Sequence, residues 1–343
     1  MRILFNITFS AILLIGLVGF WALFLNLWKP KKKWPAWVGY IIIIGAWFSA
    51  IRYYILNQVD LYGTMYYPLM NMFRTESYGF LFGVFLAIPV FIILSLLYWT
   101  INKIWGKTPE ENRTGRRAFF RTAATIVPLA TIYAAFAGQQ EVVVTHESFG
   151  YTNLPPGLKN YKIVQLSDIH IGPSIDLDDF DEILKLALLQ KPNRVVITGD
   201  LIDKLAWLPQ VCERLTTFAK QIPDGVDFIL GNHEYHHDVN KVLDALKRNT
   251  PMNILVNSNI QIMGGKQPVY IAGVAYDNDR KKDNREAMIN KALSGIPDYA
   301  FVILLAHHPE FFEESIERKI PLTLSGHTHG GQIVFMGMPL VPT

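Results

Sequence analysis

The stretch Ser325-Gly326-His327-Thr328-His329-Gly330-Gly331-Gln332 places two histidines two residues apart, directly after the apolar run 321–324. Because side chains alternate along a strand, both imidazoles are expected on one face of a strand end, where they can chelate a metal ion. The flanking glycines suit a backbone that turns sharply and lets a ligand come close. Two imidazoles are too few for a metal site, so other strands should end in matching ligands.

Four other predicted strands do end in such residues. Residues 161–166 precede Asp168 and His170, 194–198 precede Gly199-Asp200, 226–230 precede Asn232-His233, and 301–306 precede His307-His308. Taken singly, an Asp-x-His or a Gly-Asp more often belongs to a turn than to a metal site. All five sets follow apolar strands, and open α/β sheets bind their ligands at the carboxyl ends of strands. The combination therefore predicts one metal centre.

The second part of the chain alternates short β-branched runs with amphipathic segments, which predicts an α/β domain with helices outside a layered sheet. The expected strands are residues 141–145, 161–166, 194–198, 226–230, 253–256, 269–274, 301–306 and 321–324. The expected helices are residues 177–190, 206–221, 238–248, 284–293 and 310–318.

Length and charge divide the chain of 343 residues into two predicted domains, 1–138 and 139–343. The first has 13 basic and 4 acidic residues, whereas the second has 19 basic and 25 acidic ones. An acidic second domain argues against nucleic acid as a partner, since its binders need a clustered positive surface. The single cysteine, Cys212, allows neither an intrachain disulfide nor a cysteine-based zinc site.

The first domain contains four apolar stretches, at about residues 3–28, 36–56, 80–100 and 118–138. Each approaches the roughly 20 residues that cross a hydrocarbon core of about 30 Å, so an all-α transmembrane domain of four helices is expected. Lys and Arg gather before the second and fourth stretches, and such loops face the cytoplasm. We therefore expect a multi-pass protein of the cytoplasmic (inner) membrane, with residues 139–343 on the extracytoplasmic side.

The fourth stretch has a second interpretation. Gly115-Arg116-Arg117-Ala118-Phe119-Phe120-Arg121 is similar to a twin-arginine export signal, and Ala135-Phe136-Ala137 to a signal-peptidase site. The two arginines equally suit a plain cytoplasmic loop. The sequence leaves open whether this span is a permanent anchor or is cleaved after Ala137.

From about residue 141 onward, the chain resembles the calcineurin-like metallophosphoesterases, above all their membrane-anchored or twin-arginine-exported bacterial branch. The resemblance rests on residues 153–172, 199–203, 304–309 and 322–332. It implies a layered αββα sandwich. The family domain continues past Gly-His-x-His-Gly-Gly, whereas this sequence stops at Thr343, so the domain is expected to be short at its carboxyl end.

The resemblance also implies a dinuclear site. One metal ion would be held by Asp168, His170 and His329, the other by Asn232, His307 and His327, with Asp200 bridging them. Oxygen and imidazole ligands suit Mn, Fe or Zn without selecting among them. Two such ions can activate a bridging water as a hydroxide nucleophile. His233 would protonate the leaving group as general acid, while His308 would lie behind the ligands and His236 and His237 on the surface.

The expected function is that of a membrane-anchored, two-metal hydrolase of a phosphate ester or pyrophosphate, with a lipid-linked substrate favoured by the anchoring. One alternative is a catalytically silent metal-binding membrane sensor or scaffold. Another is a transporter with a regulatory domain, but the spans carry almost no charge beyond Arg52 and Arg121. Intramembrane charges usually mark transport paths, so this reading ranks last.

Overall fold

The computed structural model describes residues 142–172, 175–276, 281–329, 334–335 and 338–339, and before them only residues 64, 93, 96, 97, 100 and 126. By internal packing the chain divides into two compact units, Met1–Val143 and Val144–Thr343. Apart from single residues of the third and fourth, the predicted membrane spans lie outside the described residues, as do Arg116 and Arg117. Within the described part of the chain, no helix has the length and hydropathy to cross a membrane.

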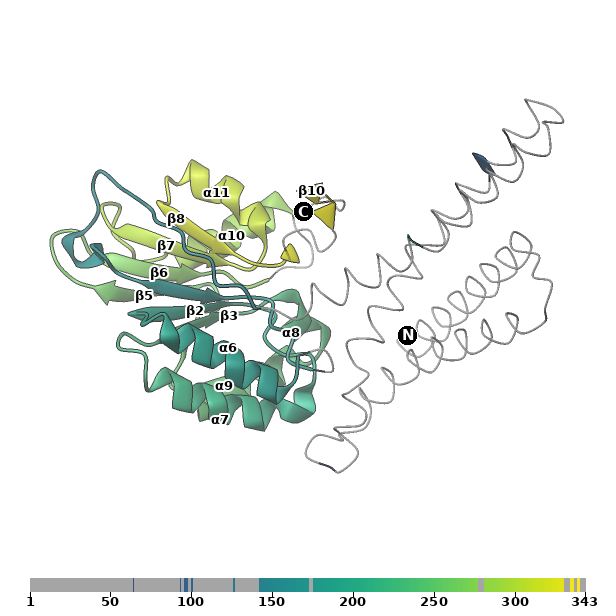
Figure 1. Cartoon of the computed structure of the whole chain (residues 1–343). Helices are drawn as coiled ribbons and strands as arrows, with labels where there is room; N and C mark the ends of the chain where they lie inside the picture. The colour runs from purple at the N-terminus through teal and green to yellow at the C-terminus, as the bar shows by residue number, and fades with distance from the viewer. Residues whose placement is uncertain are drawn as a thin grey trace, which may run out of the picture. The chain divides into compact units, whose positions relative to one another are not determined.

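The first sheet of the second unit contains parallel strands in the order β1-β2-β3-β4. These are β1 (Ile163–Leu166), β2 (Arg194–Thr198), β3 (Val226–Ile229) and β4 (Asn253–Ile254). Every residue of β2 and β3 is buried, as expected for parallel strands whose two faces are both covered. Helices α6 (Leu177–Leu189), α7 (Leu208–Ala219) and α9 (Val239–Asn249) cover the outer face (Figure 1).

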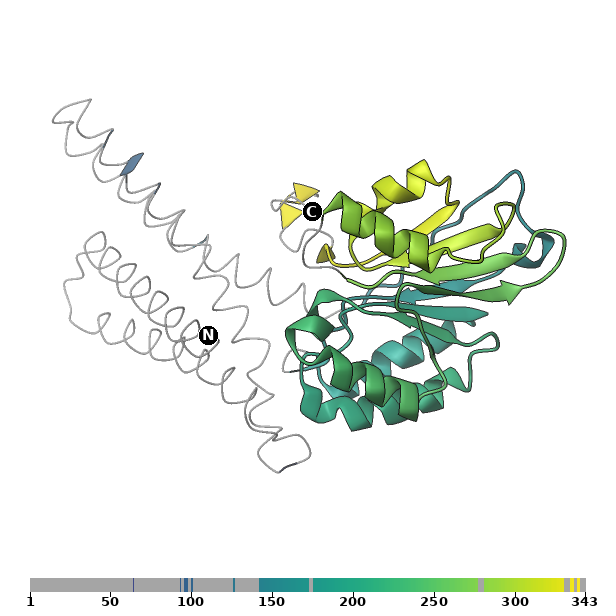
Figure 2. The same ribbon diagram turned by 180° about the vertical axis from the view of Figure 1, so that it is seen from behind.

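The second sheet is mixed, in the order β5-β6-β7-β8. Strand β5 (Ser258–Met263) runs antiparallel to β6 (Val269–Gly273), and the others, β7 (Phe301–Ala306) and β8 (Leu322–Ser325), continue parallel to β6. Helices α10 (Lys282–Ala292) and α11 (Phe312–Glu317) cover its outer face (Figures 1 and 2).

The two sheets pack face to face over one apolar core. Val196 and Ile229 of the first sheet belong to the same buried cluster as Ile271 and Ile303 of the second. The sheets approach closely at Gly273, where an added Cβ would lie 2.5 Å from Leu255 Cβ. The structure is thus an α/β fold with its layers in the order helices, sheet, sheet, helices.

Several shorter elements accompany these layers. They are the 3-10 helices η1 (Pro156–Leu158), η2 (Leu205–Trp207) and η3 (Pro309–Phe311), the short helix α8 (Asn232–His236), and the strands β9 (Val334–Phe335) and β10 (Met338–Pro339). The helix α6 begins where predicted, because Asp176 accepts hydrogen bonds from the backbone N–H groups of Asp178 and Asp179.

Two local predictions are wrong. Residues 142–145, expected in a strand, form none, and Val143 is 72% exposed. β-branched residues favour an extended chain, but a strand also needs a hydrogen-bonded neighbour, and these residues have none among the described strands. Strand β5 was not predicted, although Asn259-Ile260-Gln261-Ile262 alternates polar and apolar residues as a half-buried strand does.

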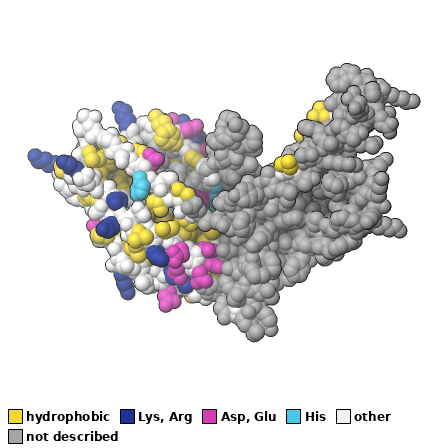
Figure 3. All heavy atoms as spheres, viewed as in Figure 1, with side chains coloured by type: hydrophobic (Ala, Val, Ile, Leu, Met, Phe, Trp, Pro, Cys, Tyr) yellow, Lys and Arg dark blue, Asp and Glu magenta, His cyan; other side chains and the backbone are white. Residues whose placement is uncertain are grey.

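Charged side chains are mixed on the face of the second unit seen in Figure 3. Lys and Arg lie scattered there among acidic, apolar and uncharged side chains rather than in one patch. A phosphate-binding surface made of clustered positive charge is therefore not visible on this face.

Candidate metal centre

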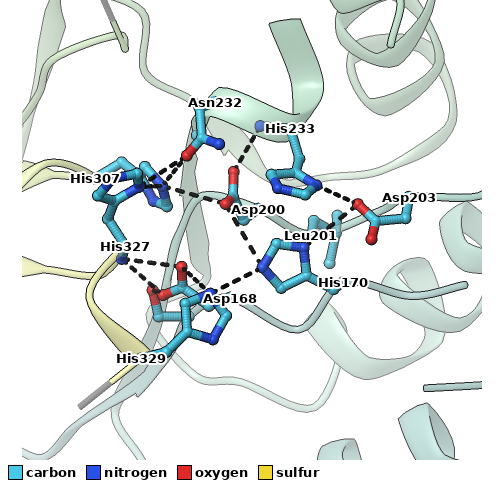
Figure 4. Close-up of polar contacts among 12 residues, drawn as sticks. Asp168, His170, Asp200, Leu201, Asp203, Asn232, His233, His307, His327 and His329 are labelled. Atoms are coloured by element: carbon cyan, nitrogen blue, oxygen red, sulfur yellow. Dashed lines mark hydrogen bonds and ion pairs between the residues drawn. The ribbon is translucent and has the colours of Figure 1, made fainter. Parts of the chain in front are cut away.

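All seven predicted metal ligands lie together in the loops that follow β1, β2, β3, β7 and β8 (Figure 4). Several of them have positive φ angles, namely Asp168 (53°), His170 (52°), Asp200 (52°), His327 (71°) and His329 (48°). Non-glycine residues in this region cost on the order of 1–3 kcal/mol each and gather at functional sites. The loops therefore hold these side chains in conformations that an unconstrained chain would avoid.

The prediction that strand alternation places the rings of His327 and His329 on one face is wrong, although both histidines lie among the candidate ligands. Strand β8 ends at Ser325, so strand alternation does not orient the two rings. Left-handed turns at both histidines direct them instead. As a result the rings separate, and each joins a different group of side chains.

The first group contains Asp168, His170 and His329, whose ligand atoms all lie within 4.8 Å of one another. His170 Nε2 is 3.2 Å from His329 Nε2, and His329 Nε2 is 3.5 Å from Asp168 Oδ1. The Asp168 carboxylate also accepts the backbone N–H of His327, at 2.9 and 3.0 Å. That hydrogen bond ties the loop after β8 to the loop after β1.

The second group contains Asn232, His307 and His327. Asn232 Oδ1 lies 3.0 Å from His307 Nε2 and 2.8 Å from His327 Nδ1, and the two ring nitrogens are 3.2 Å apart. His307 is buried, whereas His329 in the first group is partly open to solvent. Three possible ligand atoms thus form a compact triangle on the more buried side of the centre.

Asp200 lies between the two groups. Its Oδ2 is 3.6 Å from His170 Nε2 and 3.4 Å from His307 Nε2, and Oδ1 accepts the backbone N–H of His233 at 2.8 Å. Burial alone would raise the pKa of Asp200, but the hydrogen bond and charge of His307 lower it below its ordinary value. The carboxylate is 2% exposed, and its Oδ2 faces one ring nitrogen from each group.

The hydrogen bonds of the ring nitrogens that face away from the two groups indicate that the groups suit metal ions. His307 Nδ1 lies 2.8 Å from the carbonyl oxygen of Thr198, and His170 Nδ1 lies 3.3 Å from Asp203 Oδ1. A carbonyl or carboxylate can only accept, so the proton sits on Nδ1 and Nε2 is free to ligate. Metal-binding histidines are usually oriented by just such partners. The donor set therefore fits divalent ions.

His233 lies beside this centre, at the start of α8. Its Nδ1 is 2.6 Å from Asp203 Oδ1, and its ring centroid is 4.3 Å from that of His170 (Figure 4). The hydrogen bond to Asp203 raises the pKa of His233, with burial opposing it. Burial would likewise raise the pKa of Asp203, but hydrogen bonds from His170, His233 and His237 lower it.

Sequence reasoning missed three residues around the centre. Asp203 contacts both His170 and His233, and its position three residues after Asp200 was the available signal. Glu234 is wholly buried and accepts backbone N–H groups from Gly231, Asp200 and Leu201. His237, expected on the surface, has a side chain that is only 18% exposed and lies 3.6 Å from Asp203.

Two other histidines near the centre, His308 and His236, lie where they were predicted. His308 caps η3 by accepting the N–H of Glu310, and its ring is 4.5 Å from that of His327, behind the second group. His236 is exposed, as expected.

Comparison with known proteins agrees with the metal-binding chemistry of the site. The sequence profile of the calcineurin-like phosphoesterases matches residues 161–331. An uncharacterized metallophosphoesterase of Campylobacter jejuni is 30% identical over 299 residues, covering 85% of this chain and 74% of that protein. One of Aquifex aeolicus is 33% identical, covering 55% and 70%. The chain belongs to the calcineurin-like metallophosphoesterase family.

A mammalian protein is similar as well. A bovine (Bos taurus) protein named as a transmembrane protein with a metallophosphoesterase domain is 31% identical over 265 residues. The match covers 69% of this chain and 55% of that protein.

Proposed function

We propose that the chain is a membrane-anchored hydrolase of phosphate esters or pyrophosphates that works with two divalent metal ions. The observation that carries the proposal is the position of Asp200. Its buried carboxylate faces His170 of one ligand group and His307 of the other. Two groups joined by one carboxylate are the arrangement that two-metal phosphoryl chemistry needs.

In this proposal, Asp168, His170 and His329 would hold one ion, Asn232, His307 and His327 would hold the second, and Asp200 would be shared by the two groups. When bound, the ions supply Lewis-acid activation of the phosphoryl group and of the attacking water. Mn, Fe and Zn all suit these oxygen and imidazole donors. The protein's own part is to fix donor spacing through the backbone hydrogen bonds of Asp168 and Asp200.

His233 is the proposed general acid. Asp203 holds a proton on Nδ1, which orients the ring and leaves Nε2 to donate a second proton to the departing oxygen. The P–O bond breaks as that oxygen takes the proton, so the leaving group departs neutral. Asp203 is proposed as a positioning residue, because it acts through His233.

The proposal extends to the membrane. Support comes from the four apolar stretches in residues 1–138 and from the bovine relative named as a transmembrane protein. We propose domains at 1–138 and 139–343, with the second on the extracytoplasmic side of the cytoplasmic membrane. An active site anchored near a bilayer favours a lipid-linked phosphate as substrate.

The first test uses the purified full chain and a chromogenic phosphodiester. We expect hydrolysis that depends on added Mn²⁺ and is lost in Asp200→Ala and His233→Ala. His146→Gln, which changes an exposed histidine outside the groups of candidate ligands, is the matched control. Undiminished turnover in the two alanine variants would refute the proposed roles.

A screen of lipid extracts with the Mn²⁺-loaded protein tests the substrate class. Phosphate release, together with the mass of the lipid product, would identify the bond that is cut. Turnover of soluble esters only would argue against a lipid-linked substrate. Metal content near two ions per chain without hydrolysis of any phosphate ester would instead favour the silent sensor.

The anchoring has its own experiment. A protease-accessibility assay on sealed vesicles reports on which side the second domain lies. Replacing Arg116 and Arg117 by Lys should change that distribution if the pair is an export signal. An unchanged distribution would leave the pair as part of a cytoplasmic loop.

A further inference from the structure

Asp203, His233 and His237 form a cluster of possible metal ligands beside the proposed dinuclear centre. Each offers one ligand atom, and these atoms all lie within 4.8 Å of one another. His237 contacts neither ligand group in the described structure, and its partner in the cluster is Asp203. The proposed hydrolysis uses His233 and Asp203 but gives His237 no role.

The local backbone presents the two histidines as a chelating pair. His233 and His237 are four residues apart, and the N–H of His237 donates to the carbonyl oxygen of His233 at 3.1 Å, closing one helical turn at the end of α8. Residues at i and i+4 lie on the same face of a helix. Pairs of histidines at this spacing bind zinc in other helical sites.

Asp203 completes a set of two histidines and one carboxylate. Its Oδ1 is 2.6 Å from His233 Nδ1 and 3.6 Å from His237 Nε2. Ligand atoms around a tetrahedral Zn²⁺, with bonds of about 2.0–2.2 Å, lie roughly 3.3 Å apart. The His237 contact already has this spacing, and the His233 ring needs to move outward by under about 1 Å.

The cluster is also open to solvent. The side chains of His233, Asp203 and His237 are 33%, 29% and 18% exposed. An ion can therefore enter, and a water molecule can take the remaining position that three protein ligands leave. A set of imidazoles and one carboxylate suits transition metals such as zinc over Mg²⁺ or Ca²⁺.

We propose that Asp203, His233 and His237 form a separate binding site for a transition-metal ion such as Zn²⁺, and that an ion bound there inhibits hydrolysis. Binding releases the Nδ1 proton of His233 to solvent and replaces its hydrogen bond to Asp203 with a metal–nitrogen bond. The ring then keeps only its Nε2 proton, and a neutral, metal-bound imidazole is a far weaker acid than the imidazolium, so His233 no longer protonates a leaving group efficiently. The inhibition rests on the proposed function, whereas the binding does not.

Calorimetric titration of the full chain with Zn²⁺, combined with elemental analysis, tests the binding. Zn²⁺ is the only metal ion present, so exchange of one metal for another in the dinuclear centre does not contribute to the titration signal. The comparison is wild type against His237→Gln, with the exposed neighbour His236→Gln as control. We expect wild type and His236→Gln to bind one more Zn²⁺ per chain than His237→Gln.

The second measurement is the inhibition of phosphodiester hydrolysis by excess Zn²⁺. Each rate is expressed relative to the rate of the same variant without the excess. The concentration for half inhibition should rise by about tenfold or more in His237→Gln and stay unchanged in His236→Gln. Equal zinc stoichiometry and affinity in wild type and His237→Gln would overturn the site. An equal loss of zinc binding in His237→Gln and His236→Gln would also overturn it.

Extra zinc without inhibition would overturn the regulatory role and leave the site intact. Absence of any phosphoesterase activity would refute the proposed function and with it the inhibition. The zinc titration would still decide whether the site exists.

Discussion

Glu234 and Asp200 are joined by a hydrogen bond that is closed off from solvent: the backbone N–H of Asp200 donates to Glu234 Oε2 at 3.0 Å. The same carboxylate accepts the N–H groups of Leu201, at 2.8 Å, and Gly231, at 2.7 Å. These donors belong to the loops after β2 and β3, which supply Asp200 and Asn232. One buried side chain thus sets the spacing between two ligand loops.

Glu234→Gln should lower both the stability of the domain and its metal content. The new amide group replaces an acceptor oxygen with a donor that faces backbone N–H groups, and a buried unsatisfied donor costs about 1–3 kcal/mol. Thermal unfolding and elemental analysis measure the two effects. Glu213→Gln, the same change on the exposed side of α7, is the control. A wild-type melting temperature with full metal content would contradict this role.

Gly326→Ala should disturb the centre while the fold survives. A Cβ at this position would overlap Ser167 Oγ and lie 2.5 Å from Asp168 Oδ2, which pushes the carboxylate away from its ligand position. Losses of this kind typically reduce metal affinity or activity by about 10–100-fold. Metal titration with circular dichroism separates the effects, and Gly150→Ala, where nothing lies within 4 Å, is the control. Unchanged affinity would contradict the steric argument.

The order of elements was predictable because parallel strands buried on both faces are continuous apolar runs. Strand β7 has this pattern throughout, β2 has it between Arg194 and Thr198, and β3 has it apart from Asp227; every residue of the three strands is buried. Strand β5 was missed because only one of its faces meets the core. Residues 142–145 have strand-forming side chains, but pairing depends on distant parts of the chain.

The candidate ligands were predictable from their place after strands, whereas the residues that orient them were not. Asp203 and Glu234 act through contacts 30 to 34 residues away in sequence. The place of Asp203 three residues after Asp200 was a local signal, but it does not show which rings the carboxylate contacts. His237 was assigned to the surface because no strand precedes it. A helical turn does the orienting instead, and the spacing of four residues from His233 was the overlooked signal.

Asp203→Asn should slow hydrolysis more for poor leaving groups than for good ones. Asparagine keeps the size of the side chain but loses the charge that holds the Nδ1 proton of His233, so proton donation suffers. General acid catalysis contributes about 10²–10⁴-fold, and a nitrophenolate depends on it less than an alkoxide does. The ratio of kcat/KM for alkyl and nitrophenyl esters reports the difference. Equal losses on both, with lowered metal content, would mean a structural role only.

Alkaline pH should destabilise the domain in part through Tyr161. Burial is the main cause that raises its pKa to about 12 from the ordinary value of 10. Below pH 10 both states keep the phenol proton; between pH 10 and 12 the unfolded state loses it first, so the free energy of unfolding falls. Tyr161→Phe should reduce that decline in denaturant titrations across this range. An identical decline in the variant would assign it to other groups.

Arg194 and Asp227 form a buried ion pair that should be costly to break on one side only. Arg194 Nη1 donates to both carboxylate oxygens at 2.8 and 2.9 Å, and the two residues are 5% and 0% exposed. Removing one partner of such a pair costs about 3–5 kcal/mol, because the other charge stays buried without compensation. Arg194→Met should therefore lower the free energy of unfolding by that amount in urea titrations. Apolar replacement of both residues is often neutral, so Arg194→Met combined with Asp227→Leu should recover most of the loss. If the double variant is as unstable as the sum of the two single ones, the energy comes from packing around β2 and β3 rather than from the charges.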